Sequence, residues 1–555
     1  GEGRKGASFN WTKNQELRPE AWSLRLRVTG STRDLASETE TRWEGLGAPP
    51  SEHRSDFTRA QFFIVSVDNQ LRGPELGRAE LDVSAVLLRN EGEHDGCTEA
   101  GRCVSSRVRG YTQGLNYGLK WTRSDASLNE WRIGFSGTHN KSGTDLSQRL
   151  QAGTPGEQLL WHDHSNDYAF HFADVTWIPA LPKEHDLKLG WKWRGVGDRM
   201  SGFELQDGVP VSATAAFGAS RHVAGQRVEG FVQHDWRPLP QWATSVGLNW
   251  TQQRDRITEG DYHAEPQWHL FAPSANLAWK TGEGAHQQWR LSLARTFKKP
   301  ERDEQLQRPR LHPEASCPSL TLCTPNQVDQ PDITGNPALQ PERAHGLNLS
   351  FEQRWNEDTE LTVDAYARQI DGVIAQVLRQ QTVVWSAVPR WVLRPENLGE
   401  AWTRGLDLGL RWRQVFSDWA PISMTLGVQM VRSRLKTLPG PDNRLADQQP
   451  WGLKLGLRQK LKSMPVEWGV DWSAQPGSWT QVDATRSIYQ TRMRNLDADA
   501  NWQLRKDAKL VLNLRNLSRQ GKDQMQRILL RQDLWRQTSR QVGYPSLSLR
   551  LDLTL

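Results

Sequence analysis

The sequence predicts an all-β chain that folds as one large antiparallel transmembrane β-barrel. Three observations predict this fold. Apolar and polar residues alternate with a period of two along most of the chain. Short connections alternate with long ones from residue 111 onward. Tryptophan, with 27 of 555 residues, is concentrated near the ends of the alternating segments.

The alternation identifies the strands. It is clearest in five segments, at 187–193, 406–412, 422–430, 466–472 and 547–555. In the last of these, leucine occupies every second position from Leu547 to Leu555, so one face is apolar and the other polar. A soluble sheet would cover such a face with helices or a second sheet. The chain contains no set of amphipathic helices for that purpose, so we expect the apolar face to contact lipid.

The connections define two different rims. Short ones lie near 122–130, 179–186, 237–241, 280–288, 356–360 and 459–465, and long ones near 140–167, 195–227, 251–273, 298–344, 371–400 and 431–450. Strict alternation of this kind is typical of outer-membrane barrels, with short periplasmic turns and long extracellular loops. A propeller, which repeats at about 40 residues, does not explain it.

Composition excludes other classes. The hydrophobic fraction is 36% and the mean hydropathy −0.70. The longest apolar runs, 62–65 and 85–88, are far shorter than the ~20 residues of a transmembrane helix. A barrel wall needs apolar residues only at alternate positions, which reconciles this composition with a membrane. Abundant tryptophan argues against disorder, and a net charge of +6 without a basic stripe argues against nucleic-acid binding.

The predicted strand count is about 22, with 20 to 22 countable from the pattern. Segments 1–20, 371–400 and 518–545 are the places where a strand is hard to recognise. We therefore expect residues 1–21 to enter the barrel and residues 22–555 to form it. A barrel of this size has a lumen that its own side chains do not fill.

Tryptophan pairs bracket several of the short turns. They are Trp121 with Trp131, Trp236 with Trp242, and Trp279 with Trp289. An indole ring prefers an apolar phase with its N–H near water, so these pairs predict an interfacial girdle. The alternative, tryptophan in the core of a sandwich, would place the rings in the middle of strands.

The four cysteines form two local pairs, Cys97 with Cys103 and Cys317 with Cys323. The two pairs lie in the predicted long loops 89–110 and 298–344, and no Cys-x-x-Cys motif or Cys/His quartet suggests zinc. We expect two loop disulfides in an oxidising compartment. Four unrelated free thiols are the alternative.

An ordered series of motifs then resembles the barrel of TonB-dependent outer-membrane receptors. The first motif, Ala294 to Pro300, is similar to R-x-F-x-x-P and contains Phe297 and Pro300, and the second, with Asn336, Pro337, Leu339, Pro341 and Glu342, is similar to N-P-x-L-x-P-E. The third, 365–374, is similar to Y-x-R-x-I-x-x-x-I, and the fourth, with Asn397, Gly399 and Gly405, is similar to N-x-G-x-A-x-x-x-G-x-E. The fifth is 513–517, before the closing strand. Each residue also has a simpler interpretation as a turn former or bulge, and we expect these residues to be structural.

The resemblance implies a barrel of 22 strands and a role in nutrient uptake. Two features depart from the family pattern. A plug domain, with its segment that engages the energy-coupling protein, is not recognisable before Trp22, and Leu555 stands where such barrels usually end in an aromatic residue. We expect the plug to be absent from this chain, so that contact with the TonB complex would require a plug supplied elsewhere.

The predicted ligand-binding residues lie in the loop 298–344. They are Arg302, Arg308, Arg310 and His312. Arginines there favour an anionic cargo such as a ferric siderophore, although basic loops also suit lipopolysaccharide phosphates. His312 lies between two of the family motifs, where the resemblance implies that haem-uptake members carry a haem-contacting histidine. Haem is therefore an alternative ligand. The segment Trp161 to His164 has the residues for a metal site, but we expect a solvated loop tip.

No catalytic motif is recognisable, so we expect neither an enzyme nor a resident cofactor; haem or a ferric chelate enters only as transported ligand. The leading hypothesis is a multi-pass receptor in the outer membrane of a Gram-negative bacterium, with lipid, lipopolysaccharide and a ferric siderophore as partners and no nucleic acid. A passive porin-like channel and a soluble all-β binding protein are the alternatives.

Overall fold

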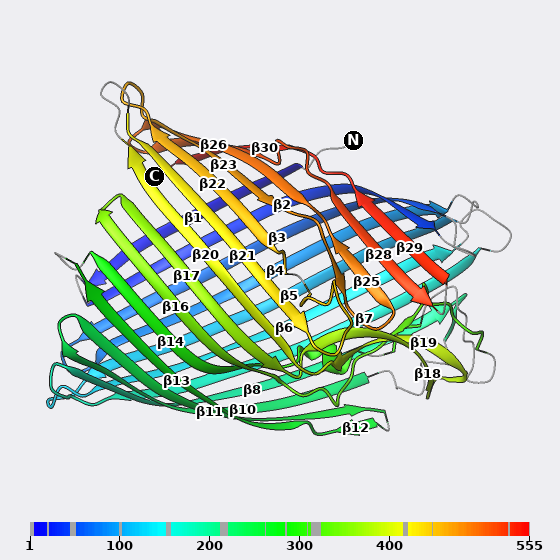
Figure 1. Cartoon of the computed structure of the whole chain (residues 1–555), viewed down its shortest axis with the longest axis horizontal. Helices are drawn as coiled ribbons and strands as arrows, with labels where there is room; N and C mark the ends of the chain where they lie inside the picture. Colours follow the sequence, from blue (N-terminus) through cyan, green and yellow to red (C-terminus); the bar gives the residue numbers. More distant parts are fainter. Residues whose placement is uncertain are drawn as a thin grey trace.

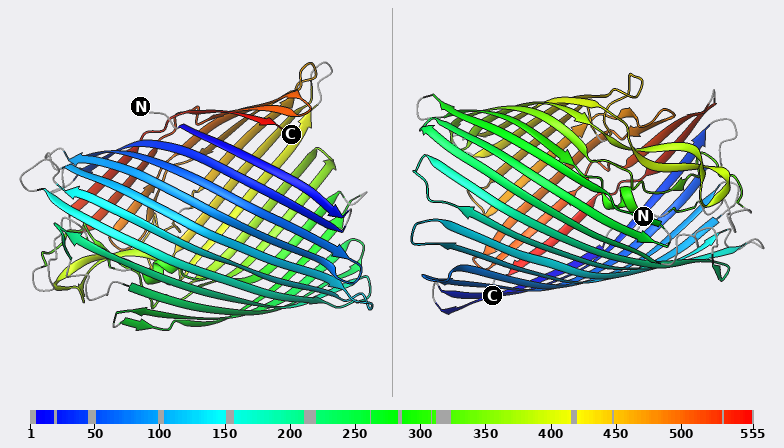
Figure 2. Two further views of the ribbon diagram at one scale, coloured as in Figure 1. Left: turned by 180° about the vertical axis from the view of Figure 1, so that it is seen from behind. Right: turned by 90° about the horizontal axis from the view of Figure 1, so that it is seen from below.

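The computed structural model describes residues 5–18, 21–44, 51–98, 103–150, 157–210, 220–260, 262–282, 286–307, 309–311, 323–414, 420–446, 448–530 and 533–553. Within these ranges 27 strand segments form one sheet, whose neighbours pair in antiparallel fashion. The sheet wraps into a barrel, with the first strands on the side opposite β16 to β23 (Figures 1 and 2). The predicted fold class is confirmed.

The first half of the wall contains the longest strands. They are β1 (Lys5–Arg18), β2 (Trp22–Glu44), β3 (Glu52–Gly73), β4 (Gly77–Thr98), β5 (Cys103–Ser124), β6 (Glu130–Leu150), β7 (Gln158–Ile178), β8 (His185–Gln206), β9 (Val209–Pro210), β10 (Ser220–Leu239), β11 (Trp242–Glu259), β12 (Tyr262–Ala264), β13 (Gln267–Thr281) and β14 (Gln287–Lys298).

The second half begins after a one-turn helix, α2 (Arg302–Leu306). Its strands are β15 (Asp332–Ile333), β16 (Glu342–Asn356), β17 (Thr359–Asp371), β18 (Ile374–Val383), β19 (Ser386–Asn397), β20 (Ala401–Gln414), β21 (Ile422–Leu435), β22 (Trp451–Lys460), β23 (Val466–Gln475), β24 (Ser478–Gln481), β25 (Arg486–Gln490), β26 (Met493–Arg505), β27 (Ala508–Arg515), β28 (Lys522–Leu530), β29 (Asp533–Gln541) and β30 (Ser546–Leu553).

The barrel closes through β2 and β29, whose residues Thr39–Glu44 and Arg536–Gln541 pair. The N-terminal part of β2, from Trp22 to Asp34, pairs with β1 instead. β1 therefore belongs to the wall, and the barrel begins before Trp22. Segments outnumber the 20 to 22 expected strands because one crossing is often divided. For example, β27 and β28 are two parts of one crossing, and β29 and β30 are two parts of the next. Accordingly, β27 pairs with β30 and β28 pairs with β29.

Short turns and long loops lie at opposite rims. The turns at 125–129, 179–184, 240–241, 357–358 and 461–465, and the connection that joins β13 to β14, coincide with the short connections that the sequence predicts. We call their end of the barrel the turn rim. The other end is the loop rim, where β18 and β19 lie (Figure 1). Tryptophans stack at the turn rim, with ring centroids 6.0 Å apart for Trp131 and Trp177 and 5.2 Å apart for Trp242 and Trp279. This arrangement fits the predicted girdle.

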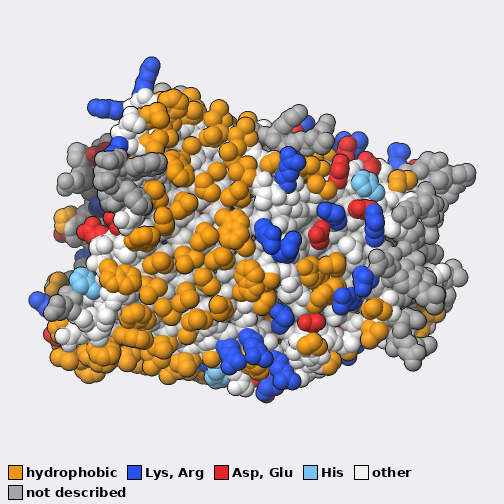
Figure 3. Space-filling view, turned by 45° about the horizontal axis from the view of Figure 1, so that its top comes forward, with side chains coloured by type: hydrophobic (Ala, Val, Ile, Leu, Met, Phe, Trp, Pro, Cys, Tyr) orange, Lys and Arg blue, Asp and Glu red, His pale blue; other side chains and the backbone are white. Residues whose placement is uncertain are grey.

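The outer face of the wall is an apolar belt. Leu291 and Leu293, Leu347 and Leu349, and Leu547 and Leu549 are exposed along alternate positions of their strands. Figure 3 shows the continuous hydrophobic surface, with charged side chains gathered toward one end. None of the described helices has the length and apolarity that a membrane span requires. Buried apolar clusters are small and lie mostly near the loop rim.

Several predicted long loops are in fact strand. β6 extends to Leu150 and β7 begins at Gln158, so most of 140–167 is wall. The predicted loops 89–110, 195–227 and 251–273 are largely strand as well. The hydrophobic alternation ends where a strand leaves the apolar belt, but the backbone hydrogen bonds continue. The sequence pattern therefore placed the strand ends too early.

Candidate functional site at the loop rim

A small second sheet fills part of the loop rim. It contains the β18–β19 hairpin and β15, which pairs in parallel with β19 through Asp332 and Ile333. We call this sheet, together with residues 323–341, the rim subdomain. The predicted loop 371–400 is therefore an ordered hairpin rather than an irregular loop.

A buried ion pair joins two distant parts of the rim subdomain. Both Asp332 and Arg390 are fully buried, and Arg390 donates from Nε to Asp332 Oδ2 at 2.9 Å and from Nη2 to Oδ1 at 2.7 Å. Trp385 Nε1 also donates to Asp332 Oδ2, at 2.9 Å, and Arg390 Nη1 bonds the Thr324 carbonyl. This bidentate geometry satisfies both charged groups without water.

Two asparagine side chains, of Asn326 and Asn397, form hydrogen bonds with backbone groups of the rim subdomain. Asn326 Oδ1 accepts from Trp391 N at 2.7 Å, and Asn326 Nδ2 donates to the Trp391 carbonyl at 2.8 Å. Asn397 bonds Gln340 N and O, each at 2.9 Å, in the same reciprocal manner. Each amide thus replaces a missing strand neighbour.

The wall on the opposite flank also holds this hairpin. Asp483 accepts from Leu378 N at 3.0 Å, and Arg486 Nη2 donates to the Gln376 carbonyl at 2.8 Å. Burial lowers the pKa of Arg486, an effect that Asp483 opposes. Ile528 of β28 is fully buried against Leu378. The rim subdomain is therefore anchored on both sides.

Two of the four predicted ligand residues, Arg302 and Arg310, lie beside the rim subdomain. Arg302 begins α2, which is held by hydrogen bonds of 2.8 Å from Asn336 N to the Glu304 carbonyl and from Gly335 N to the Gln307 carbonyl. Arg310 is exposed, and its backbone bridges Ile333. Arg308 and His312 lie outside the described residues. Ligand contact by these four residues stays a prediction.

The family-motif residues make backbone contacts at the same rim. Asn336 Nδ2 donates to the Pro395 carbonyl at 2.9 Å and begins the turn that contains Pro337. Leu339 is buried, as is Pro300, and Glu342 Oε1 accepts from Ile374 N at 2.7 Å. Pro341 precedes β16. These contacts connect the loop before β16 to the hairpin.

At two of the motif glycines, Gly399 and Gly405, a larger side chain would not fit. Gly399 has a φ of +93°, and a Cβ there would lie 2.9 Å from Thr437 Cγ2. A Cβ at Gly405 would lie 2.5 Å from the Tyr366 ring, which crosses the strand at that point. Larger residues at either position would displace a neighbour or strain the backbone.

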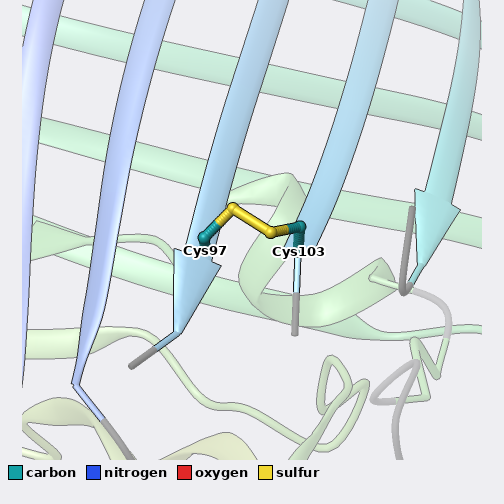
Figure 4. The surroundings of a disulfide bond; sticks show 2 residues. All are labelled: Cys97 and Cys103. Atoms are coloured by element: carbon teal, nitrogen blue, oxygen red, sulfur yellow. A yellow bond between two sulfur atoms is a disulfide. The ribbon is translucent and has the colours of Figure 1, made fainter. Parts of the chain in front are cut away.

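Cys97 and Cys103 form a disulfide, as their spacing predicts (Figure 4). It joins the ends of β4 and β5, where the two residues are also register partners. Cys323 is disulfide-bonded and buried in the rim subdomain. Its predicted partner, Cys317, lies outside the described residues, so that pairing stays a prediction.

We expect Cys97→Ser/Cys103→Ser to leave the barrel folded. Loop-closure entropy for so short a ring amounts to about 2 kcal/mol, and the β4–β5 ladder persists without it. Hydrogen exchange should accelerate at the loop-rim end of β4 and β5 alone. Global loss of the heat-resistant folded band on a gel would contradict this expectation.

The segment Trp161 to His164 is not a loop tip. It lies within β7 and pairs with β6 and β8 above the apolar belt. The expectation of a solvated tip was wrong because the polar sequence there continues a strand. Among the described ranges, no group of three or more His, Cys, Asp or Glu side chains is placed to hold a metal ion.

An inward-facing cluster of cations and aromatic rings was not predicted. On β8, Trp191 is 45% exposed on the outer face, so the alternation directs Lys192 and Arg194 into the lumen. The sheet register places Arg194 directly opposite Arg227 of β10. Two arginines therefore meet on one inward face near the loop-rim edge of the belt.

Aromatic rings surround these cations. The Arg194 guanidinium lies 5.4 Å from the Phe170 ring centroid and 5.9 Å from that of Phe172. Lys192 Nζ lies 5.1 Å from the Phe231 centroid, and the Arg227 guanidinium 6.0 Å from that of Phe297. We call this set the cation–aromatic cluster: Phe170, Phe172, Lys192, Arg194, Arg227, Phe231 and Phe297.

The cluster carries net positive charge. Glu229 pairs with Arg227, but no carboxylate of the described residues lies within ion-pair distance of Arg194 or Lys192. Like charges on directly opposite residues are unfavourable in a sheet. An anionic group bound between the two strands would relieve that repulsion.

Comparison with known proteins supports the fold. A family model described as TonB dependent receptor-like, beta-barrel, matches residues 84–517. The outer membrane transporter YddB from Escherichia coli is similar with a TM-score of 0.60 and 10% identity, covering 97% of this chain and 75% of that one. The copper transporter OprC gives a TM-score of 0.53 at 10% identity, covering 94% and 88%. No curated protein matches the chain.

Proposed function

Since this chain belongs to the TonB-dependent receptor family as its β-barrel, we propose that it takes up an anionic ferric chelate of the siderophore class across the outer membrane. Members of this family are receptors and transporters rather than enzymes. The loop rim is then the extracellular side, and the lumen is the path that a ligand follows.

The cation–aromatic cluster is the observation that best supports this proposal. Catecholate and carboxylate chelates of ferric iron are negatively charged, so they suit guanidinium groups, and the planar rings of a catecholate can also stack on aromatic side chains. Arg194 and Arg227 lie at the inner edge of the extracellular half, where a ligand that has passed the rim subdomain would arrive. Arg310, exposed at the rim, adds a cation on the way in.

Two alternatives have less support. Haem uptake depends on His312, which lies outside the described residues. A passive channel can also be lined by arginines, but charged residues alone do not account for the aromatic rings that flank Arg194 and Arg227. Coupling to the TonB complex through a plug, which the sequence analysis does not recognise before Trp22, stays a prediction.

The test uses the full-length receptor in detergent and two probes, a trianionic ferric tris-catecholate and an uncharged ferric tris-hydroxamate. Arg194→Gln/Arg227→Gln should weaken tris-catecholate binding by at least about a hundredfold, because each of the two charge-assisted hydrogen bonds contributes about 1.5–3 kcal/mol. Tryptophan fluorescence quenching measures both affinities.

Lys454→Gln is the matched control. Lys454 lies among the inward-facing positions of β22, since Leu453 and Leu455 alternate with it, but it contributes nothing to the cluster. Its replacement should leave both affinities within twofold of the original, as an order-of-magnitude expectation for a remote charge. Equal binding by the arginine double variant and the unaltered receptor would overturn the proposal.

A further inference from the structure

An apolar groove crosses the outer, lipid-facing surface of β16, β17, β20 and β21. Its volume is about 720 Å³, and its lining includes Leu347, Leu349, Ala365, Ala367, Leu406 and Met430. The alanines form the floor because larger side chains stand on either side. An apolar hollow of this volume on the lipid-facing surface is suited to a hydrocarbon chain.

Three arginines lie at the extracellular end of the groove. Arg404 and Arg432 line it and are direct register partners, and Arg434 is the next residue on the same face of β21. All three are exposed. They follow the outward alternation of Leu406 and Met430, so they face the surroundings of the barrel rather than its lumen.

These arginines lack acidic partners. No carboxylate of the described residues lies within ion-pair distance of Arg404, Arg432 or Arg434; the recorded neighbour of Arg404 is the Trp402 ring at 5.4 Å. Directly opposed like charges destabilise a sheet. Elsewhere on β20 arginines are paired: Arg411 with Glu360 at 2.7 Å and Arg413 with Asp358 at 2.8 Å.

The depth of the arginines matches a lipid headgroup. Arg404 is eight positions along β20 from Trp412, which is exposed at the turn rim. With a rise of ~3.3 Å per residue and a tilt near 40°, this is roughly 20 Å along the membrane normal. The hydrocarbon band of such barrels is about 25 Å tall. The arginines therefore lie near the outer interface.

We propose that this groove is a binding site for lipopolysaccharide, with a lipid A phosphate between Arg404 and Arg432 and an acyl chain in the groove. Three cations without acidic partners complement a phosphorylated glycolipid, and the apolar floor complements its chains. The site lies on the outside of the barrel, so it is separate from the ligand path.

The test measures lipid adducts on the full-length receptor by native mass spectrometry after delipidation. The added lipids are lipid A, its dephosphorylated form and phosphatidylglycerol. Arg404→Gln/Arg432→Gln should reduce the lipid A adduct about tenfold, and dephosphorylated lipid A should bind comparably weakly. Arg411→Gln/Arg413→Gln, with the same change of charge on the same strand, should retain the adduct.

A second variant tests the groove itself. Ala367→Trp fills the floor while leaving the arginines in place, and it should reduce lipid A binding by a similar factor. Unchanged lipid A binding in both variants would overturn the proposal, and so would phosphatidylglycerol binding as tightly as lipid A. The heat-resistant gel band reports that each variant is folded.

Discussion

Replacing Asp332 with alanine is expected to unfold the rim subdomain while the barrel stays intact. The change leaves Arg390 as a buried charge without its carboxylate, and breaking a buried pair in this way costs about 3–5 kcal/mol. Trp385 loses a hydrogen bond as well. Hydrogen exchange of peptides that cover 374–397 should rise strongly, and ligand binding should fall because α2 and Arg310 lose their support.

Two further variants make this expectation specific. Arg379→Ala removes an exposed partner of Glu396 on the same hairpin, which should change stability by less than about 1 kcal/mol. Asp332→Leu/Arg390→Met removes both charges and should recover part of the lost protection. Exchange in Asp332→Ala that matches the unaltered protein would show that this ion pair is not needed to hold the hairpin in place.

Val428→Lys should destabilise the barrel by about 2–4 kcal/mol, because a lysine on the lipid face near the middle of the membrane loses its hydration. Val428 lies near the middle of β21, on the outer face, between Leu426 and Met430. Met430 is 52% exposed. The measurement is urea unfolding of the receptor in lipid vesicles.

Gln429→Lys is the matched control for this substitution. Gln429 is the next residue on β21 and faces the lumen, where water hydrates a charge. Its replacement should change the free energy of unfolding by less than about 1 kcal/mol. Equal destabilisation by both variants would mean that the two faces of β21 are not lipid and lumen.

The alternation in the sequence predicted the wall well because lipid imposes it directly. Leucines at every second position, as in Leu547 to Leu555, permit little other than a strand with one apolar face. The short turns were equally predictable, since polar residues interrupt the pattern there. Above the belt this constraint ends, and strands such as the upper part of β7 become indistinguishable from loops.

The candidate site was less predictable because it depends on contacts between distant residues. Asp332 and Arg390 are separated by 58 positions, and neither belongs to a local motif. Arg194 meets Arg227 only through the register of β8 with β10. The motif residue Phe297 was interpreted as structural, and its position near Arg227 follows from the fold rather than from its neighbours in sequence.

Uptake of radioactive iron as the ferric tris-catecholate distinguishes an active receptor from a passive channel. Cells that express the full-length receptor should accumulate iron with saturable kinetics, and a strain that lacks TonB should lose this uptake. Uptake that rises in proportion to chelate concentration and persists without TonB would show a passive channel and contradict the account.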